Sequence, residues 1–170
     1  MRSHPGGEAH TRRMLELAGL PAGASVLDMG AGAGETLALL RALGYVPRGI
    51  DLAPRGAGVE RGDLLHAPYP DGSFDAVISQ CAFFVSGDQR GALREANRVL
   101  RPGGRLLLSD VFFEEPERLL RSAGFDLLRA EDETAEWREY YLKAIWRGDA
   151  PCCGVPGGKS GYWILIGRKE

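Results

Sequence analysis

Val26-Leu27-Asp28-Met29-Gly30-Ala31-Gly32-Ala33-Gly34-Glu35 is the stretch that decides the fold. Its apolar start predicts a buried strand, its three glycines predict a tight turn, and the residues that follow predict a helix. Glycine lets the backbone adopt positive φ and approach a ligand closely, and the amides at the start of the next helix point toward the bound molecule. The order of strand, glycine turn and helix therefore predicts a nucleotide-binding cradle.

The charge of this turn indicates which nucleotide it binds. A dinucleotide carries a pyrophosphate, and its G-x-G-x-x-G pattern needs a small sixth residue where this chain has Glu35. Asp28, two residues before the first glycine, disfavours an anion further. S-adenosylmethionine has no phosphate but carries an ammonium and a sulfonium that a carboxylate attracts, and backbone amides can take its carboxylate. The charge therefore favours S-adenosylmethionine over NAD.

Two more acidic residues follow predicted strands. Asp51 ends a short second strand, at about the twenty-residue interval where such folds contact ribose hydroxyls. Asp63 ends a third, where it can accept from the adenine amino group while Leu64 packs on the ring. Three acids at three successive strand ends are hard to explain by packing, so we expect all three at the cofactor.

At this point the chain resembles class I S-adenosylmethionine-dependent methyltransferases, in the branch of ubiquinone and menaquinone C-methyltransferases and arsenite methyltransferases. The motifs that carry the resemblance are residues 26–34, 49–51, 62–63, 68–79 and 98–106, within a match over roughly residues 20 to 130. The resemblance implies an α/β fold, a single Rossmann-like doubly wound domain with a mostly parallel sheet in the order 3-2-1-4-5-7-6 and strand 7 antiparallel. It also implies S-adenosyl-L-methionine as cofactor. The expected cofactor-binding residues are Asp28, Gly30, Ala31, Gly32, Asp51, Leu52, Asp63, Leu64 and Gln80.

Apolar periodicity and turn residues give the order of elements. We expect strands at 25–29, 46–50, 59–61, 74–79, 105–109, 125–129 and 161–167, and helices at 8–19, 34–43, 88–100, 114–122 and 134–148. Only eleven residues separate Asp51 from Asp63, so the usual second crossover helix should be reduced to a loop and the third strand to a short edge. Residues 1–170 should form one domain, with a helix and lid at 1–20.

An insertion at residues 132–160 separates the last two predicted strands. Its first part should be a helix capped by Thr134, and its second part is rich in glycine. Aromatic residues on this helix, including Tyr140 and Tyr141, are more typical of a core or a dimer surface than of a substrate cage. Because inserted segments carry much of the variation within a fold, we expect substrate specificity to be determined here.

The sequence does not assign a catalytic residue. Methyl transfer from a sulfonium needs mainly alignment of the acceptor and exclusion of water. Candidates for a base or an orienting group are Asp110 at the end of the fifth strand, Tyr140, Tyr141, and the histidines His4 and His10. Cys81, which ends the fourth strand, is a further catalytic candidate. Two alternatives stay open: a non-catalytic S-adenosylmethionine-binding regulatory protein, and a nicotinamide-dependent oxidoreductase, which Asp28 and Glu35 disfavour.

The chain has three cysteines that could together bind a metal or metalloid. The resemblance places Cys81 at a strand end where arsenite methyltransferases carry a metalloid thiolate, and Cys152 and Cys153 could complete a three-thiol site. A small buried cysteine used as a hydrophobe is the simpler interpretation of Cys81. The arsenite enzymes also carry a further C-terminal domain, so we expect no metal and treat a metalloid-binding, methyltransferase-like protein as an alternative.

The composition of the chain narrows the kinds of molecule that it is expected to bind. The net charge is −2 and no block of like charge would follow a phosphate backbone, so nucleic acid is a poor substrate. No apolar stretch approaches the roughly 18 residues that cross a bilayer, so we expect no membrane segment. The vicinal Cys152 and Cys153 fit a reducing compartment, and we expect a cytoplasmic enzyme acting on a small molecule. The sequence leaves monomer and homodimer, and the identity of the acceptor, open.

Overall fold

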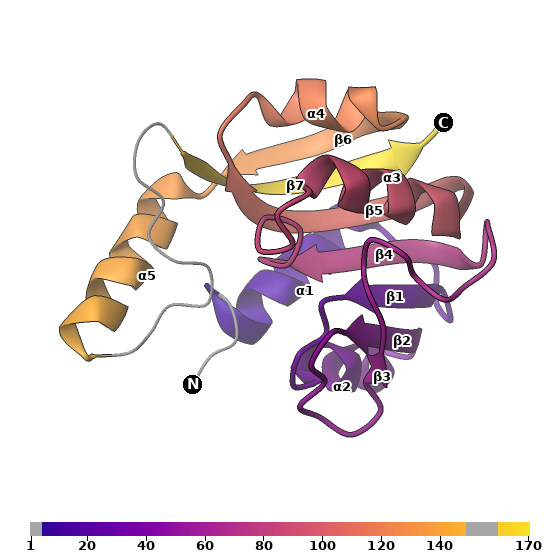
Figure 1. Ribbon diagram of the computed structural model, residues 1–170, viewed down its shortest axis with the longest axis horizontal. Coiled ribbons are helices and arrows are strands. Elements are labelled where there is room, and N and C mark those ends of the chain that lie inside the picture. Colours follow the sequence, from indigo (N-terminus) through magenta and orange to yellow (C-terminus); the bar gives the residue numbers. More distant parts are fainter. Residues whose placement is uncertain (1–4, 149–159) are drawn as a thin grey trace.

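The computed structural model describes residues 5–148 and 160–170, which build a seven-stranded sheet in the order β3-β2-β1-β4-β5-β7-β6 (Figure 1). Its strands are β1 (Ser25–Met29), β2 (Val46–Asp51), β3 (Glu60–Arg61), β4 (Phe74–Gln80), β5 (Leu100–Phe112), β6 (Phe125–Asp132) and β7 (Gly161–Lys169). β7 is antiparallel to both β5 and β6, whereas the pairs among β1 to β5 are parallel. The predicted order and the antiparallel last strand are confirmed.

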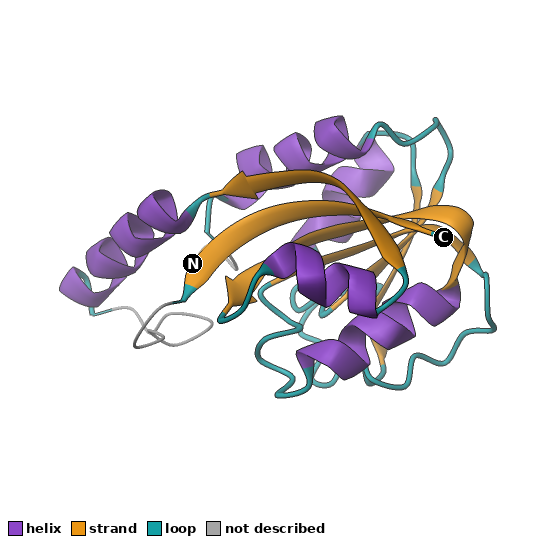
Figure 2. Ribbon diagram, turned by 90° about the horizontal axis from the view of Figure 1, so that it is seen from above, coloured by secondary structure: helices purple, strands orange, loops and turns teal. Residues whose placement is uncertain are grey.

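Helices cover both faces of the sheet (Figure 2). They are α1 (Gly7–Ala18), α2 (Glu35–Ala42), α3 (Gln89–Val99) and α4 (Pro116–Ser122). Met14 of α1 and Leu40 of α2 belong to one buried cluster, with Ile78 of β4. Leu93 of α3 and Leu120 of α4 belong to the other, on the opposite face. The alternate residues of the buried parallel strands thus supply two apolar cores, which explains their nearly continuous apolar sequences.

The second crossover is a loop, as predicted. Residues 52–59, all of them described, contain no helix, and β3 has only two residues. The loop is fastened to the glycine turn, because the Arg55 N–H donates to the Gly32 carbonyl at 2.9 Å. A Cβ at Gly56 would lie 1.9 Å from the Ala33 carbonyl oxygen, so glycine is required there. The loop therefore packs directly against the turn after β1.

The fifth strand is longer than predicted. β5 starts at Leu100 opposite Phe74, and its regular pairing resumes with Arg105 opposite Ala76 after an irregularity. At its other end it pairs with β7 as far as Phe112 opposite Gly161. Asp110 was predicted at the carboxyl end of this strand but lies inside it, because the antiparallel partner extends the pairing by two residues.

The helix of the insertion forms, but its predicted cap is wrong. In α5 (Thr134–Trp146), Thr134 is the first helical residue, and Glu133, which precedes it, makes no side-chain cap hydrogen bond. The Thr134 N–H donates to Asp132 Oδ1 at 2.9 Å. The Thr134 hydroxyl oxygen instead accepts the Tyr162 N–H at 3.0 Å, which ties α5 to the start of β7. Figure 1 shows α5 beyond the carboxyl ends of the parallel strands, near the start of α1. Among the described helices, none is long and apolar enough to cross a membrane.

Candidate functional site

The glycine turn after β1 brings three backbone segments close together. Gly30 has φ of 95°, and a Cβ there would lie 2.3 Å from Ala82 Cβ, so only glycine fits. The N–H groups of Gly30 and Ala31 both donate to the Ile50 carbonyl, at 2.9 and 3.0 Å. These two amides therefore hold the end of β2, and the expectation that amides at the start of α2 take the carboxylate of a ligand stays a prediction. The turn therefore allows a ligand to approach the backbone closely.

The carboxylate of Asp51 is held by two backbone amides. Its Oδ2 accepts the Gly32 N–H at 2.8 Å, and its Oδ1 accepts the Ala53 N–H at 2.9 Å. Each carboxylate oxygen keeps further acceptor capacity, since it has two lone pairs. The end of β2 therefore presents a fixed acceptor pair of the kind that two ribose hydroxyls require.

Asp28 is the deepest acidic group of this region. It lies on β1 and is 4% exposed. Burial, and secondly the negative charge of Asp51, raise the pKa of Asp28 to about 7. A buried carboxyl group with this pKa is ready to ionise when a positively charged ligand enters beside it.

The end of β4 is connected to two helices by the side-chain amide of Gln80. Its Nε2 donates to the Thr11 hydroxyl of α1 at 3.1 Å, and its Oε1 accepts the Thr36 hydroxyl of α2 at 3.2 Å. On the same strand, the buried Ser79 hydroxyl donates to the Met29 carbonyl at 2.7 Å, which fixes β4 against β1. α1 thus takes part in building the site.

The residues that follow β3 in the chain form the opposite end of the site. The Asp63 Oδ1 accepts the Leu65 N–H at 2.8 Å, and Leu64 is buried whereas Leu52 is 62% exposed. Behind it, the Arg98 guanidinium donates to Glu95, to Asp71 and to the backbone carbonyls of residues 67 and 69. This arginine fixes the segment that follows Asp63.

These groups surround one cavity of about 540 Å³ at the carboxyl ends of the parallel strands. All nine residues predicted to bind the cofactor line it: Asp28, Gly30, Ala31, Gly32, Asp51, Leu52, Asp63, Leu64 and Gln80. The remaining lining residues are Glu35, Thr36, Ile50, Ala53, Arg55, Gly62, Leu65, Cys81, Ala82, Val85 and Ser86. Glu35 and Thr36 immediately follow the glycine turn, which is the signal that would have predicted them. Arg55 and Val85 lie on irregular loops and have no such signal.

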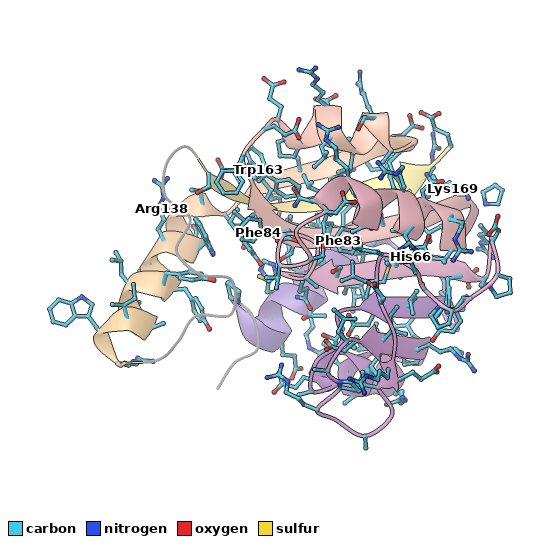
Figure 3. All side chains as sticks on the ribbon, in the orientation of Figure 1. His66, Phe83, Phe84, Arg138, Trp163 and Lys169 are labelled. Atoms are coloured by element: carbon cyan, nitrogen blue, oxygen red, sulfur yellow. The ribbon has the colours of Figure 1, made fainter. Side chains whose placement is uncertain are left out.

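Cys81 ends the cavity wall after β4. It is the only described non-glycine residue with positive φ, 58°, and its N–H donates to the Ser109 carbonyl at 2.8 Å. Its Sγ lies 3.4 Å from the Tyr162 hydroxyl, within hydrogen-bonding distance. The strained conformation ends β4 and turns the chain toward Phe83, which is fully buried, and Phe84 (Figure 3).

Asp110 does not line this cavity. It is fully buried in β5, where its Oδ2 accepts the Phe84 N–H at 2.9 Å and its Oδ1 accepts the Val111 N–H at 2.8 Å. Its carboxylate therefore anchors the loop after β4. The prediction that it acts as a base on the acceptor has no support from its position.

The other predicted candidates lie beside a second cavity of about 310 Å³, between α1 and α5. His10 and Tyr140 line it, together with Arg13, Glu133, Glu136, Trp137, Tyr162 and three residues of the N-terminal segment. Tyr141 is buried and packs edge-on against Trp137. His10 is 7% exposed, so the predicted histidine belongs to the interior.

Several predicted residues lie outside the described residues: His4, Cys152 and Cys153. Within residues 5–148 and 160–170, no group of three or more His, Cys, Asp or Glu side chains is placed to hold a metal ion. Whether the three cysteines converge therefore stays a hypothesis.

Comparison with known proteins agrees with this geometry. A family described as "Methyltransferase domain" matches residues 27–108, which include the glycine turn, Asp51 and Asp63. Demethylmenaquinone methyltransferase of Tropheryma whipplei is 35% identical over 129 residues, covering 66% of this chain and 52% of that protein. The chain thus spans about half the length of this curated relative.

A second relative is matched over more of its length. The 27-O-demethylrifamycin SV methyltransferase of Amycolatopsis mediterranei is 30% identical over 187 residues, covering 82% of this chain and 69% of that protein. Geranyl diphosphate C-methyltransferase of Streptomyces coelicolor has the same fold, with a TM-score of 0.75 at 15% identity over 95% of this chain and 79% of that one. The chain belongs to the S-adenosylmethionine-dependent methyltransferases, whose cofactor is the one predicted from the charge of the glycine turn.

Proposed function

We propose that this domain transfers a methyl group from S-adenosylmethionine to a small-molecule acceptor. The observation that carries the proposal is the charge of the 540 Å³ cavity, whose described lining contains four acids and one basic residue, Arg55. A positively charged donor without phosphate matches that lining, whereas a dinucleotide would place its pyrophosphate among carboxylates.

The lining residues suggest how the donor lies. The ammonium and sulfonium groups face Asp28, the ribose hydroxyls reach Asp51, and the adenine lies near Asp63 and Leu64. The glycine turn lets the donor approach the backbone closely. The amides of residues 30–32 are already engaged by Ile50 and Asp51. The methyl group then points toward the end of β4, where Gln80 and Cys81 lie.

The acceptor enters at the Cys81 end. The described helices of the insertion at 132–160 and of the segment at 1–20, α5 and α1, line the neighbouring 310 Å³ cavity, whose lining also includes Tyr162, the hydrogen-bonding neighbour of Cys81. We assign them to acceptor binding and closure within one domain of residues 1–170. Methyl transfer is an in-line displacement in which the sulfonium already activates the carbon, so alignment and exclusion of water are the main tasks of these segments.

Calorimetry tests the cofactor. We expect S-adenosylhomocysteine to bind and NAD to give no heat of binding at the same concentration. Binding of NAD alone would overturn the proposal. A truncation before Glu8 should weaken binding of S-adenosylhomocysteine because it disturbs the start of α1, which positions Thr11; unchanged affinity would contradict a closing role for this segment.

Transfer is tested separately. Donor with a labelled methyl group, offered with a panel of phenols, carboxylic acids, amines, thiols and arsenite, should label at least one acceptor. Binding of donor without labelling of any acceptor would favour the regulatory alternative. A metalloid preference would require labelling of arsenite that is lost in Cys81→Ser.

A further inference from the structure

A continuous series of side-chain hydrogen bonds leads from the cofactor cavity to the second cavity. The Cys81 Sγ lies 3.4 Å from the Tyr162 hydroxyl, which is hydrogen-bonded to the Ser109 hydroxyl. Ser109 Oγ lies 2.8 Å from His10 Nε2, and His10 Nδ1 lies 3.0 Å from the Glu133 carboxylate. The five residues come from five places in the chain: the end of β4, β7, β5, α1 and the residue before α5.

The chemistry of the groups gives this series a direction. An ionised Glu133 can only accept, so His10 Nδ1 must donate to it. In a neutral imidazole Nε2 is then the acceptor, so the Ser109 hydroxyl donates to His10. Ser109 accepts in turn from Tyr162, and Tyr162 accepts from the Cys81 thiol. Every proton in the series points toward His10.

The two ends of the series open into different cavities, and Ser109 in its middle lines neither of them. Cys81 lines the 540 Å³ cavity, and Tyr162, His10 and Glu133 line the 310 Å³ cavity. Ser109 and Tyr162 are fully buried. A proton that moves from Cys81 to the second cavity through these residues therefore follows the hydrogen bonds.

We propose that Tyr162, Ser109, His10 and Glu133 form a proton relay that removes the proton released by the methyl acceptor at Cys81. The inference rests on the proposed methyltransferase function. As the methyl carbon bonds to the acceptor atom, its bond to sulfur breaks, and that electron pair stays on the donor sulfur. The acceptor proton passes to Cys81 Sγ, the thiol proton to Tyr162, the phenol proton to Ser109, and the serine proton to His10 Nε2. His10 becomes an imidazolium paired with Glu133 and loses its extra proton through the second cavity.

Charged groups surround the Glu133 end of the relay. Glu131 and Glu136 face Glu133, with Arg13 as the opposing cation. Burial, followed by Glu136 and Glu131, raises the pKa of Glu133, and Arg13 lowers it. At the other end burial, with Cys81 and Asp110 adding to it, raises the pKa of Tyr162 well above its ordinary value, so the phenol passes a proton on without resting as a phenolate.

The tautomer of His10 tests the direction of the relay without any acceptor. The full chain, labelled with ¹⁵N-histidine, is measured at pH 8 by long-range ¹H–¹⁵N correlation, and His10→Gln assigns the signal. We expect His10 to carry its proton on Nδ1. A proton on Nε2, or an imidazolium at pH 8, would contradict the proposal.

The reactivity of Cys81 tests whether its proton reaches His10. Cys81 is alkylated with iodoacetamide in the absence of cofactor, and the rate is read from the Cys81 peptide by mass spectrometry. We expect Tyr162→Phe and His10→Gln each to slow alkylation at pH 7.5 by about tenfold, because the thiolate is the reactive form and its proton then no longer passes to His10. His66→Gln is the matched control, since His66 is exposed and lies across the molecule from Arg138 of α5 (Figure 3).

The variants separate a relay from a local contact. Slower alkylation in Tyr162→Phe with an unchanged rate in His10→Gln would show that Tyr162 acts alone, and it would overturn the relay. An unreactive Cys81 in the parent protein would do the same. Circular dichroism and S-adenosylhomocysteine calorimetry establish that each variant folds and binds. Because neither test needs methyl transfer, a failed relay and a failed methyltransferase give different results.

Discussion

The Asp51 carboxylate accepts a hydrogen bond from the Gly32 N–H at 2.8 Å across nineteen residues of chain. This bond joins the glycine turn after β1 to the end of β2. Asp51 therefore has two tasks in the proposed site, since it holds the turn in shape and presents acceptors to the ribose.

Asp51→Asn separates these two tasks. Its amide keeps one oxygen, which can still accept from Gly32, but the NH₂ group cannot accept from Ala53 or from a ribose hydroxyl. We expect affinity for S-adenosylhomocysteine to fall by about 1.5–3 kcal/mol, roughly 10- to 100-fold, measured by calorimetry. Asp126→Asn, at an exposed ion pair with Arg168, is the control and should leave affinity unchanged.

Asp28→Asn should stabilise the cofactor-free protein while weakening cofactor binding. The pKa of Asp28 is raised from 3.8 in the unfolded chain to about 7, so the folded state keeps a proton that the unfolded state releases. Stability therefore falls as the pH rises from about 4 to 7, by about 4 kcal/mol as an upper bound at 1.36 kcal/mol per unit. Above pH 7 the asparagine variant avoids this loss, and chemical denaturation at pH 5 and pH 8 measures the difference.

The affinity for S-adenosylmethionine should have the opposite pH dependence. A cation binds the ionised form of Asp28, so affinity should increase as the pH rises through about 7. Asp28→Asn should remove this increase. An equal pH dependence in both proteins would show that another group titrates.

Gly30→Ala should destabilise the turn strongly. The added Cβ would lie 2.3 Å from Ala82 Cβ at a φ of 95°, so overlap and backbone strain together should cost about 3 kcal/mol. Gly19→Ala is the matched control, because it has a φ of 58° but nothing within 4 Å, and it should cost about 1 kcal/mol. Adding Ala82→Gly should recover the part caused by overlap, as measured by denaturation.

Arg98→Ala should loosen the segment after Asp63. Arg98 bonds Glu95, Asp71 and two backbone carbonyls, so we expect a loss of about 2 kcal/mol in stability. The Arg98 hydrogen bond lowers the pKa of Glu95, so this contribution is present above pH 4.5 and is lost as the pH falls through the lowered value. The difference between the parent and Arg98→Ala should therefore shrink in acid, whereas the exposed Arg94→Ala should match the parent throughout.

Local patterns predicted most of the fold. The residues of β1 were predicted to the residue, since its apolar run ends in a glycine turn. The pairing of β5 to Phe112 was missed because it depends on β7, whose Gly161 follows 49 residues later. Thr134 was assigned as a cap from its position before an apolar helix, whereas its hydroxyl is used by the Tyr162 N–H.

The candidate site likewise has one part that local sequence patterns predict and another that they do not. The glycines and acids that line the cofactor cavity follow consecutive strands, so their sequence order predicts their convergence. The hydrogen bond between His10 and Ser109 spans 99 residues and joins α1 to β5. No local pattern contains such a pair, and His10 by itself was one weak candidate among several.

The loop that replaces the second crossover helix has a practical consequence. Beside Asp63, the cavity is bordered by the exposed Leu52 and by a short glycine-containing loop, which present little bulk around the expected position of the adenine. Synthetic donors enlarged at the purine amino group should consequently be accepted here, although a wall built from a full helix would exclude them. Such donors would offer a selective chemical label for the acceptor of the proposed methyl transfer.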